Sequence, residues 1–141
     1  DGRYARFGGV DALRFFEEVL FCYLTGNNDM HLKNFSLLRE PDGAWNLSPA
    51  YDLVPAQIHL PKDSEELALT LNGKKRRLVS DDFAAFAASL HLTDTQFKRA
   101  VRRLTGRLAE TLDETLARSF LSQEFQSKVR SLVASRLRVF E

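Results

Sequence analysis

A short polar segment between two apolar ones constrains the fold more than any other part of this chain. Residues 25–34 read Thr-Gly-Asn-Asn-Asp-Met-His-Leu-Lys-Asn, so Asp29, His31, Lys33 and Asn34 stand within six positions. Strongly apolar segments precede and follow it. Because the burial of unpaired charge is costly, these four side chains must be solvated, paired or in contact with a ligand. The segment is therefore a candidate functional loop.

The sequence before this loop predicts a buried helix. Apolar residues recur at helical spacing over 10–24 and cover most of the helix circumference, which is typical of a central helix. Gly26 can adopt the left-handed conformation that ends a helix. Cys22 lies in this apolar run, which predicts a buried, unreactive thiol. Residues 1–9, which are rich in glycine, are predicted to form a loop that leads into the helix.

The carboxy-terminal part of the chain is also predicted to be helical. Helices are expected over 81–90, over 94–118 and from 123 to near the end of the chain. Their amino-terminal caps are predicted at Ser80, at Thr93 (which forms a capping box with Gln96) and at Ser122. The last helix has an apolar stripe of Phe125, Val129, Leu132, Val133 and Leu137.

Between the helical parts, the sequence predicts a small β-hairpin. Short apolar strands at 35–38 and 44–47 are separated by Glu-Pro-Asp-Gly, in which proline presets φ and glycine accepts a positive φ. Such a hairpin would carry the chain from the polar loop back towards Asp52. Further along, segment 56–66 is expected to be irregular, and the alternating segment 67–71 is a candidate for a short strand ended by Asn-Gly.

Composition is that of an ordinary globular domain. Apolar residues make up 44% and charged residues 28% of the 141-residue chain, a length that fits one domain. Residues 1–70 hold 6 Lys and Arg against 11 Asp and Glu, whereas residues 71–141 hold 14 against 8. The acidic half contains the polar loop. No apolar run reaches the length of a membrane span and there is no signal-peptide pattern, so a cytoplasmic protein without membrane contact is expected.

The spacing of the polar residues is typical of phosphoryl transfer. Asp29 and Asn34 lie five positions apart, as do the Asp and Asn of the loop H-R-D-x-x-x-x-N, where Asp orients the attacking hydroxyl and Asn binds magnesium. Asp52 follows the hairpin and can join Asn34 as an oxygen ligand of magnesium. Asp29 then remains free to accept the proton of a hydroxyl nucleophile. His31 and Lys33 can donate hydrogen bonds or positive charge to the transferring phosphoryl group.

The runs GNNDMHLKNFSLL and LSPAYDLVP closely resemble the carboxy-terminal region of the HipA family of serine/threonine toxin kinases. The order D-x-H-x-x-N is also similar to the catalytic loop of phosphatidylinositol 3-kinases. The resemblance implies a mainly α fold with a small β-hairpin, of the protein-kinase-like C-lobe type. It implies Asp29 as the catalytic base, Asn34 and Asp52 as Mg²⁺ ligands, and His31 beside the phosphates of ATP.

Partners and domain organisation also follow from this resemblance. Similar proteins phosphorylate a hydroxyl on a protein target, with aminoacyl-tRNA synthetases as the known substrate class. They are commonly neutralised by a small DNA-binding antitoxin of the HipB type, so contact with DNA is expected only through the antitoxin. The nucleotide-clamping amino-terminal lobe has no counterpart here. Residues 1–141 are therefore expected to be one C-lobe from a longer kinase, inactive alone, with a catalytic loop at 26–34 and a metal-binding segment at 49–55.

Two other readings of the same residues remain open. The chain can be a binding module that contacts an antitoxin, a target protein or nucleic acid without catalysis. It can also be a metal-dependent hydrolase that uses Asp29, His31 and Asp52, although the sequence contains neither H-x-x-x-H nor H-x-D in this region. A measurement of magnesium and nucleotide binding distinguishes the binding module from a kinase. The zinc or manganese content of the purified protein distinguishes the hydrolase from a kinase.

Overall fold

The computed structural model describes residues 8–61 and 64–141. Within these ranges the α-helices are α1 (Gly9–Thr25), α2 (Ser80–Ser89), α3 (Asp94–Ala117) and α4 (Gln123–Leu137). The strands β1 (Leu37–Arg39) and β2 (Trp45–Leu47) form one antiparallel sheet, and the 3₁₀ helices are η1 (Leu32–Asn34), η2 (Ala56–His59) and η3 (Arg138–Phe140). The prediction of a mainly helical fold with a small hairpin is confirmed. None of the helices in the described ranges is both long enough and apolar enough to cross a membrane.

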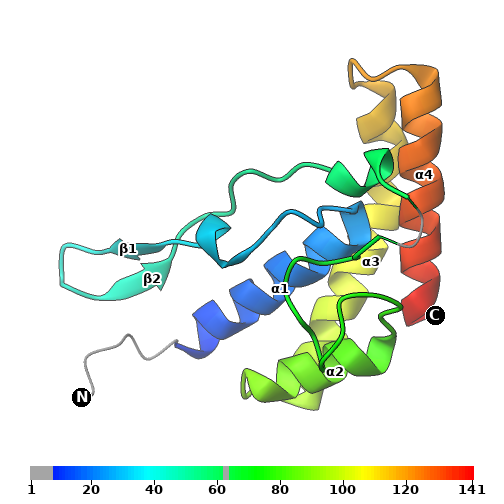
Figure 1. Cartoon of the computed structure of the whole chain (residues 1–141). Coiled ribbons are helices and arrows are strands. Elements are labelled where there is room, and N and C mark those ends of the chain that lie inside the picture. The colour runs from blue at the N-terminus through cyan, green and yellow to red at the C-terminus, as the bar shows by residue number, and fades with distance from the viewer. Residues whose placement is uncertain (1–7, 62–63) are drawn as a thin grey trace.

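Helix α1 lies at the centre of the hydrophobic core. It runs through the middle of the molecule (Figure 1) and contacts α2, α3 and α4. Phe16, Leu20 and Leu24 are fully buried, which confirms the predicted central helix. Cys22 is a buried free thiol, and burial, together with the nearby charge of Glu18, raises the pKa of this thiol to about 12. The predicted burial of this cysteine is therefore confirmed. The loop predicted over residues 1–9 lies outside the described residues except for Gly8 and the first residue of α1.

The end of α1 depends on one glycine. Gly26 has a φ of 74° in the left-handed region, and its N–H donates to the Tyr23 carbonyl at 3.3 Å. The N–H of Asn27 donates to the Cys22 carbonyl at 2.8 Å, so the helix ends in a Schellman motif. A Cβ on Gly26 would lie 2.9 Å from Cδ2 of Leu132 in α4. Both the backbone angle and the packing therefore require glycine, and the predicted helix end is confirmed.

The caps of α3 and α4 are those that the sequence predicts. Oγ1 of Thr93 accepts the Gln96 N–H at 3.2 Å, and Oε1 of Gln96 accepts the Thr93 N–H at 2.8 Å. This reciprocal pair is a capping box. At α4, Oγ of Ser122 accepts the Phe125 N–H at 3.2 Å. These helix starts are local features, which is why the sequence alone locates them.

The start of α2 differs from the prediction. Ser80 is the first residue of the helix, and Val79 occupies the cap position instead. The carboxylate of Asp82 accepts the Val79 N–H at 3.0 Å and supplies a hydrogen bond at the start of the helix. Ser80 lies inside the helix and so cannot be its cap residue, and the contact made at this end is the one from the Val79 N–H to Asp82.

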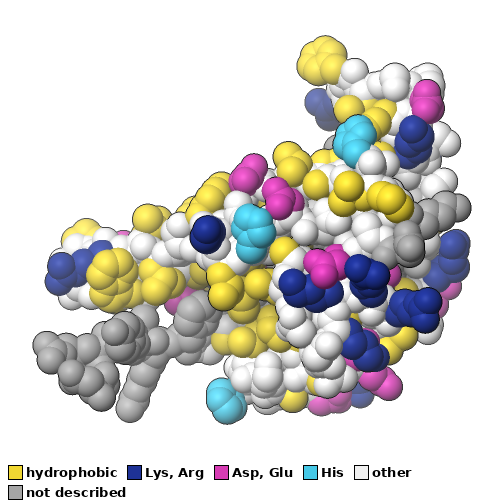
Figure 2. Space-filling model, in the orientation of Figure 1, with side chains coloured by type: hydrophobic (Ala, Val, Ile, Leu, Met, Phe, Trp, Pro, Cys, Tyr) yellow, Lys and Arg dark blue, Asp and Glu magenta, His cyan; other side chains and the backbone are white. Residues whose placement is uncertain are grey.

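The hairpin forms as predicted, although its first strand begins two residues later than expected. Leu37 pairs with Leu47 and Arg39 pairs with Trp45. The hairpin projects away from α3 and α4 (Figure 1), and hydrophobic side chains are visible along this projection (Figure 2). Leu37, Leu38 and Trp45 are each about half exposed. The hairpin thus brings little of its own apolar surface into the core.

The strand proposed for 67–71 is wrong. Only an isolated bridge between Leu71 and Lys74 forms there, closed by the turn residues Asn72 and Gly73, which both have positive φ. Leu67 and Leu71 are buried because they pack into the core around α1, and no second strand lies beside this segment in the described ranges. The segment predicted to be irregular also contains one ordered turn, η2.

Candidate functional site

The polar loop leaves the end of α1 and is anchored in the core by one apolar side chain. Met30 is buried in the same hydrophobic cluster as α1, whereas Asp29, His31 and Lys33 are exposed. The residues that follow make the single turn of η1. The loop therefore presents charged side chains to solvent while Met30 holds its backbone against the core.

Asp29 and His31 form a pair on this exposed surface. Nε2 of His31 lies 3.2 Å from Oδ1 of Asp29, and both side chains are more than half exposed. The His31 N–H also donates to the Asp29 carbonyl at 3.1 Å. An imidazole with its proton on Nε2 can donate to the carboxylate and fix its orientation. Asp29 is thus held in place and still open to a ligand from solvent.

Asn34 and Asp52 meet at the base of the hairpin. Nδ2 of Asn34 donates to Oδ2 of Asp52 at 3.1 Å, across 18 residues of sequence. Oδ1 of Asn34 accepts the His31 N–H at 3.3 Å. A continuous polar path therefore runs from Asp29 through His31 and Asn34 to Asp52. All three residues expected to act together lie on this path.

A buried side chain that the sequence analysis did not single out links the two acidic segments. Asn27 is only 1% exposed. Its Oδ1 accepts the Asp29 N–H at 3.3 Å, and its Nδ2 donates to the Asp52 carbonyl at 3.4 Å. Asp52 has a φ of 57°, a left-handed conformation that costs a non-glycine residue on the order of 1 kcal/mol. The only sequence signal for this role is an asparagine directly after the glycine that ends α1.

Hydrogen bonds from the hairpin hold the segment around Asp52 against η1. Oγ of Ser36 and the hydroxyl oxygen of Tyr51 lie 2.7 Å apart. The Tyr51 hydroxyl also donates to the Lys33 carbonyl at 3.4 Å. The Ser48 N–H donates to the Ser36 carbonyl at 2.8 Å. Tyr51 therefore ties the segment around Asp52 to η1, a role that only the folded chain reveals.

A family model described as the HipA-like C-terminal domain matches residues 3–112. The chain belongs to the HipA-like C-terminal domain family. Among solved structures, it resembles HipA from Shewanella oneidensis MR-1 in a complex with HipB and operator DNA, with a TM-score of 0.63 and 28% identity over 89% of this chain. The family resemblance noted from the sequence is thereby confirmed.

Curated relatives of this HipA-like domain are named as kinases. The chain is 35% identical over 86 residues, or 60% of its length, to "Putative kinase Y4dM" of Sinorhizobium fredii (strain NBRC 101917 / NGR234). It is 26% identical over 123 residues, or 77% of its length, to "Putative kinase" of Haemophilus influenzae (strain ATCC 51907 / DSM 11121 / KW20 / Rd). It spans 21% and 36% of these two proteins, and 30% of the Shewanella HipA chain.

A cleft lies beside the polar loop of this HipA-like domain. It encloses about 480 Å³ and is lined by His31, Leu32, Lys33, Ala68, Leu69, Thr70 and Lys75. Lys33 forms no ion pair within residues 8–61 and 64–141, so its charge is available to an anionic ligand. Asp29, Asn34 and Asp52 do not line this cleft. His31 thus connects the two sides of the loop, since its ring contacts Asp29 and also borders the cleft.

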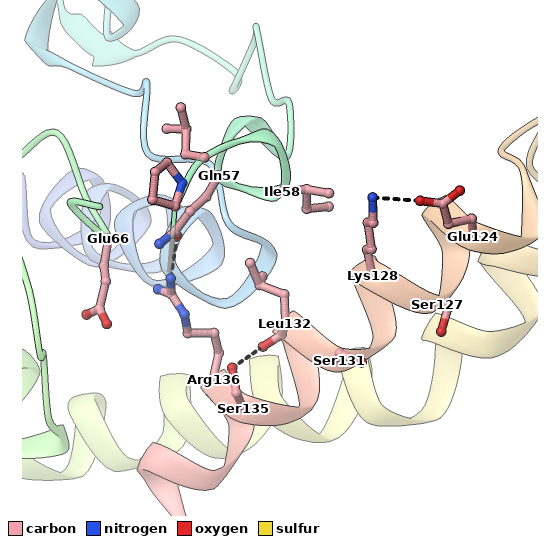
Figure 3. Close-up of a pocket in the computed structure, with 12 residues that line it drawn as sticks. Gln57, Ile58, Glu66, Glu124, Ser127, Lys128, Ser131, Leu132, Ser135 and Arg136 are labelled. Carbon is pink, nitrogen blue, oxygen red and sulfur yellow. Dashed lines mark hydrogen bonds and ion pairs between the residues drawn. The ribbon is translucent and has the colours of Figure 1, made fainter. Parts of the chain in front are cut away.

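A second cavity lies away from this site, between η2 and α4 (Figure 3). It encloses about 710 Å³. At its edge Arg136 donates to the side-chain oxygen of Gln57, and also to the Tyr23 carbonyl at 3.2 Å. The Gln57 N–H in turn donates to the Gly26 carbonyl at 3.0 Å. Arg136 therefore supports the end of α1, from which the catalytic loop departs.

The donor atoms at the hairpin base suit magnesium better than zinc. Oδ2 of Asp52 is hydrogen-bonded to Asn34, while Oδ1 has no hydrogen bond within the described part of the chain. Asn34 would meet a cation through Oδ1, which here accepts the His31 N–H. One carboxylate and one amide oxygen are hard ligands that match magnesium held jointly with phosphates. In the described residues no three His, Cys, Asp or Glu side chains form a metal-binding group.

Proposed function

We propose that this domain is the catalytic C-lobe of a HipA-like serine/threonine kinase, which transfers the γ-phosphate of ATP to a hydroxyl on a protein target. The observation that carries the proposal is the polar path from Asp29 to Asp52. It links the exposed Asp29 carboxylate, which is held by His31, to the side chains of Asn34 and Asp52 through one series of hydrogen bonds. Phosphoryl transfer requires this combination, because its catalysis is mostly positioning and charge stabilisation.

Each residue has a separate part in this reaction. Asp29 accepts the proton of the attacking hydroxyl, and His31 holds the Asp29 carboxylate in orientation. Asn34 and Asp52 bind Mg²⁺, which neutralises the charge on the phosphates when it is bound. Lys33 lines the adjacent cleft and offers positive charge to the phosphates of ATP. His31 borders the same cleft, so its ring can also donate to a phosphate there.

The proposed partners follow from the family. The Shewanella HipA structure contains HipB and operator DNA. By analogy, the parent of this domain is the toxin of a toxin–antitoxin pair, bound by a HipB-like antitoxin that itself contacts DNA. The protein substrate class is proposed from the family likeness alone, with an aminoacyl-tRNA synthetase as the first target to test.

The test uses the full-length parent protein with ATP labelled at the γ-phosphate. Label should appear on Ser or Thr of a protein target in the presence of Mg²⁺, and chelation should abolish it. The 141-residue chain alone should show little turnover, because it spans only 21% and 36% of the two relatives named as kinases, and positioning the nucleotide is expected to need more of the protein. A parent that transfers no phosphate to any protein would overturn the kinase proposal.

A binding module is the second candidate function. It is favoured by the solved HipA structure, in which HipA is part of an assembly with HipB and DNA. Calorimetry of magnesium and ATP, with and without a separately supplied amino-terminal lobe, distinguishes the two functions. A kinase lobe should gain nucleotide binding when the second lobe is added, whereas a binding module should bind antitoxin and show no such gain.

A further inference from the structure

Asn27 occupies an unusual position for a polar side chain. It is only 1% exposed and lies beside the fully buried residues at the end of α1. Buried amides require partners, and both polar atoms of this side chain have one. Its Oδ1 accepts the Asp29 N–H at 3.3 Å, and its Nδ2 donates to the Asp52 carbonyl at 3.4 Å. The amide thus bridges the backbones of two segments that are 23 residues apart in the sequence.

The backbone of Asn27 is itself hydrogen-bonded to the buried end of α1. Its N–H donates to the Cys22 carbonyl at 2.8 Å within the Schellman motif. Gly26, the preceding residue, is packed against Leu132 and accepts the Gln57 N–H at 3.0 Å. The side chain of Asn27 therefore extends from an anchored helix end, while Asp29 and Asp52 are themselves exposed.

We propose that Asn27 is a positioning residue that sets the placement of the Asp52 carboxylate relative to Asp29. This inference rests on the proposed kinase function. Asp52 is held at a φ of 57°. The hydrogen bond from Asn27 to its carbonyl favours that conformation, which carries the carboxylate to Asn34. Without the bridge, the Asp52 segment loses its tie to the anchored helix end, and the oxygen-ligand pair loses its preorganised geometry.

The neighbouring residue provides a matched control. Asn28 is also an asparagine of the same loop, and its Nδ2 donates to the Glu65 carbonyl at 2.8 Å. That bond ties the loop to a different segment and does not reach Asp29 or Asp52. Asn28→Ala therefore removes a comparable hydrogen bond without touching the proposed bridge.

The experiment compares Asn27→Leu with Asn28→Ala in the full-length parent. Leucine has nearly the shape of asparagine but cannot form either hydrogen bond. We expect Asn27→Leu to raise the Mg²⁺ concentration for half-maximal phosphoryl transfer by about tenfold and to lower kcat, because a misplaced ligand or base slows the reaction. Asn28→Ala should change both quantities far less, because neither Asp29 nor Asp52 loses a hydrogen bond in that variant. An Asn27→Leu enzyme with unchanged Mg²⁺ dependence and kcat would overturn the inference.

Two further measurements keep the inference decidable. If Asn27→Leu does not fold, Asn27→Asp can replace it, because it preserves the size of the side chain and the acceptor for the Asp29 N–H. This variant should still raise the Mg²⁺ concentration for half-maximal transfer, because it removes the donor to the Asp52 carbonyl. Hydrogen exchange on the 141-residue chain tests the Asn27 bridge without an activity measurement. The Asp29 backbone amide should exchange about tenfold faster in Asn27→Leu than in Asn28→Ala. If the wild-type parent transfers no phosphate, the kinase proposal fails, and equal exchange in the two variants would separately overturn the bridge.

Discussion

Asp82 and Asp52 differ in burial and in the number of hydrogen bonds that their carboxylates accept. The comparison shows how a carboxylate that stabilises the fold differs from one that is open to a ligand. Asp82 is 1% exposed, and its two oxygens accept hydrogen bonds from Asn72 at 3.0 Å, Val79 N–H at 3.0 Å and Lys74 at 3.1 and 3.2 Å. Asp52 is exposed, and within residues 8–61 and 64–141 its side chain accepts one hydrogen bond, from Asn34 at 3.1 Å. The carboxylate of Asp82 is satisfied by protein donors. The carboxylate of Asp52 still has oxygen lone pairs that can accept hydrogen bonds or bind a cation.

Electrostatics at Asp82 agree with this view. Burial alone would raise the pKa of its carboxyl group. The hydrogen bonds from Val79, Asn72 and Lys74, with the charge of Lys74, outweigh burial and hold the pKa of Asp82 below its usual value. A carboxylate of this kind stabilises the start of α2 and the Asn72 turn. The exposed carboxylates of Asp29 and Asp52 are expected to contribute little to stability.

The largest expected effect is at Asp29 in the full-length parent. Asp29→Asn should lower phosphoryl transfer by roughly 1,000-fold, because general base catalysis contributes about that factor. Nucleotide affinity should be largely unchanged, since Asp29 acts on the acceptor hydroxyl. Single-turnover transfer and calorimetry measure the two quantities, with Asp42→Asn, in the exposed hairpin turn, as the control. A large loss of nucleotide affinity would show that Asp29 binds the nucleotide instead.

The next largest effect is on stability. Asp82→Ala should lower the free energy of unfolding by about 3 kcal/mol, because it leaves buried donors, one of them charged, without their acceptor. Asp81→Ala, at the exposed neighbouring position in the same first turn, should cost only a few tenths of a kcal/mol through the helix dipole. Urea unfolding measures both. Equal losses would remove the distinction between satisfied and available carboxylates.

Asp52→Asn should have the reverse profile. Magnesium-dependent nucleotide affinity in the parent should fall about tenfold, or roughly 1.4 kcal/mol, since one anionic ligand beside the phosphates is lost. The free energy of unfolding of the 141-residue chain should change by less than about 0.5 kcal/mol, as at other exposed positions. Calorimetric titration and urea unfolding provide the two values. Full activity in this variant would exclude Asp52 from the metal site.

The smallest effect is confined to acid pH. Because the pKa of Asp82 is lower in the folded than in the unfolded chain, its stabilisation is present above the unfolded value of about 3.9 and is lost as pH falls through the folded value. The stability difference between wild type and Asp82→Asn should therefore be constant near neutral pH and narrow below pH about 4. Thermal unfolding across pH 2–7 tests this, and a constant difference throughout would contradict it.

Much of the fold is readable from the sequence because it depends on local interactions. The capping residues Thr93 and Ser122, the glycine that ends α1 and the turn between the two strands all act within a few residues. The cap predicted at Ser80 is wrong because the helix begins one residue earlier than expected, at Ser80 itself. Segment 67–71 has the alternation of a strand but lacks a partner, and a partner cannot be seen in the segment itself.

The candidate site divides in the same way. The spacing of Asp29 and Asn34 in one loop is a property of the sequence, and so is the position of Asp52 just beyond a hairpin. Only the tertiary structure decided that Asn34 meets Asp52, that Asn27 is buried between the acidic segments, and that Asp82 is a structural acid. Arg136 reaches the Tyr23 carbonyl across 113 residues. Such contacts arise from helix packing, which places groups together whatever their separation along the chain, so no local pattern encodes them.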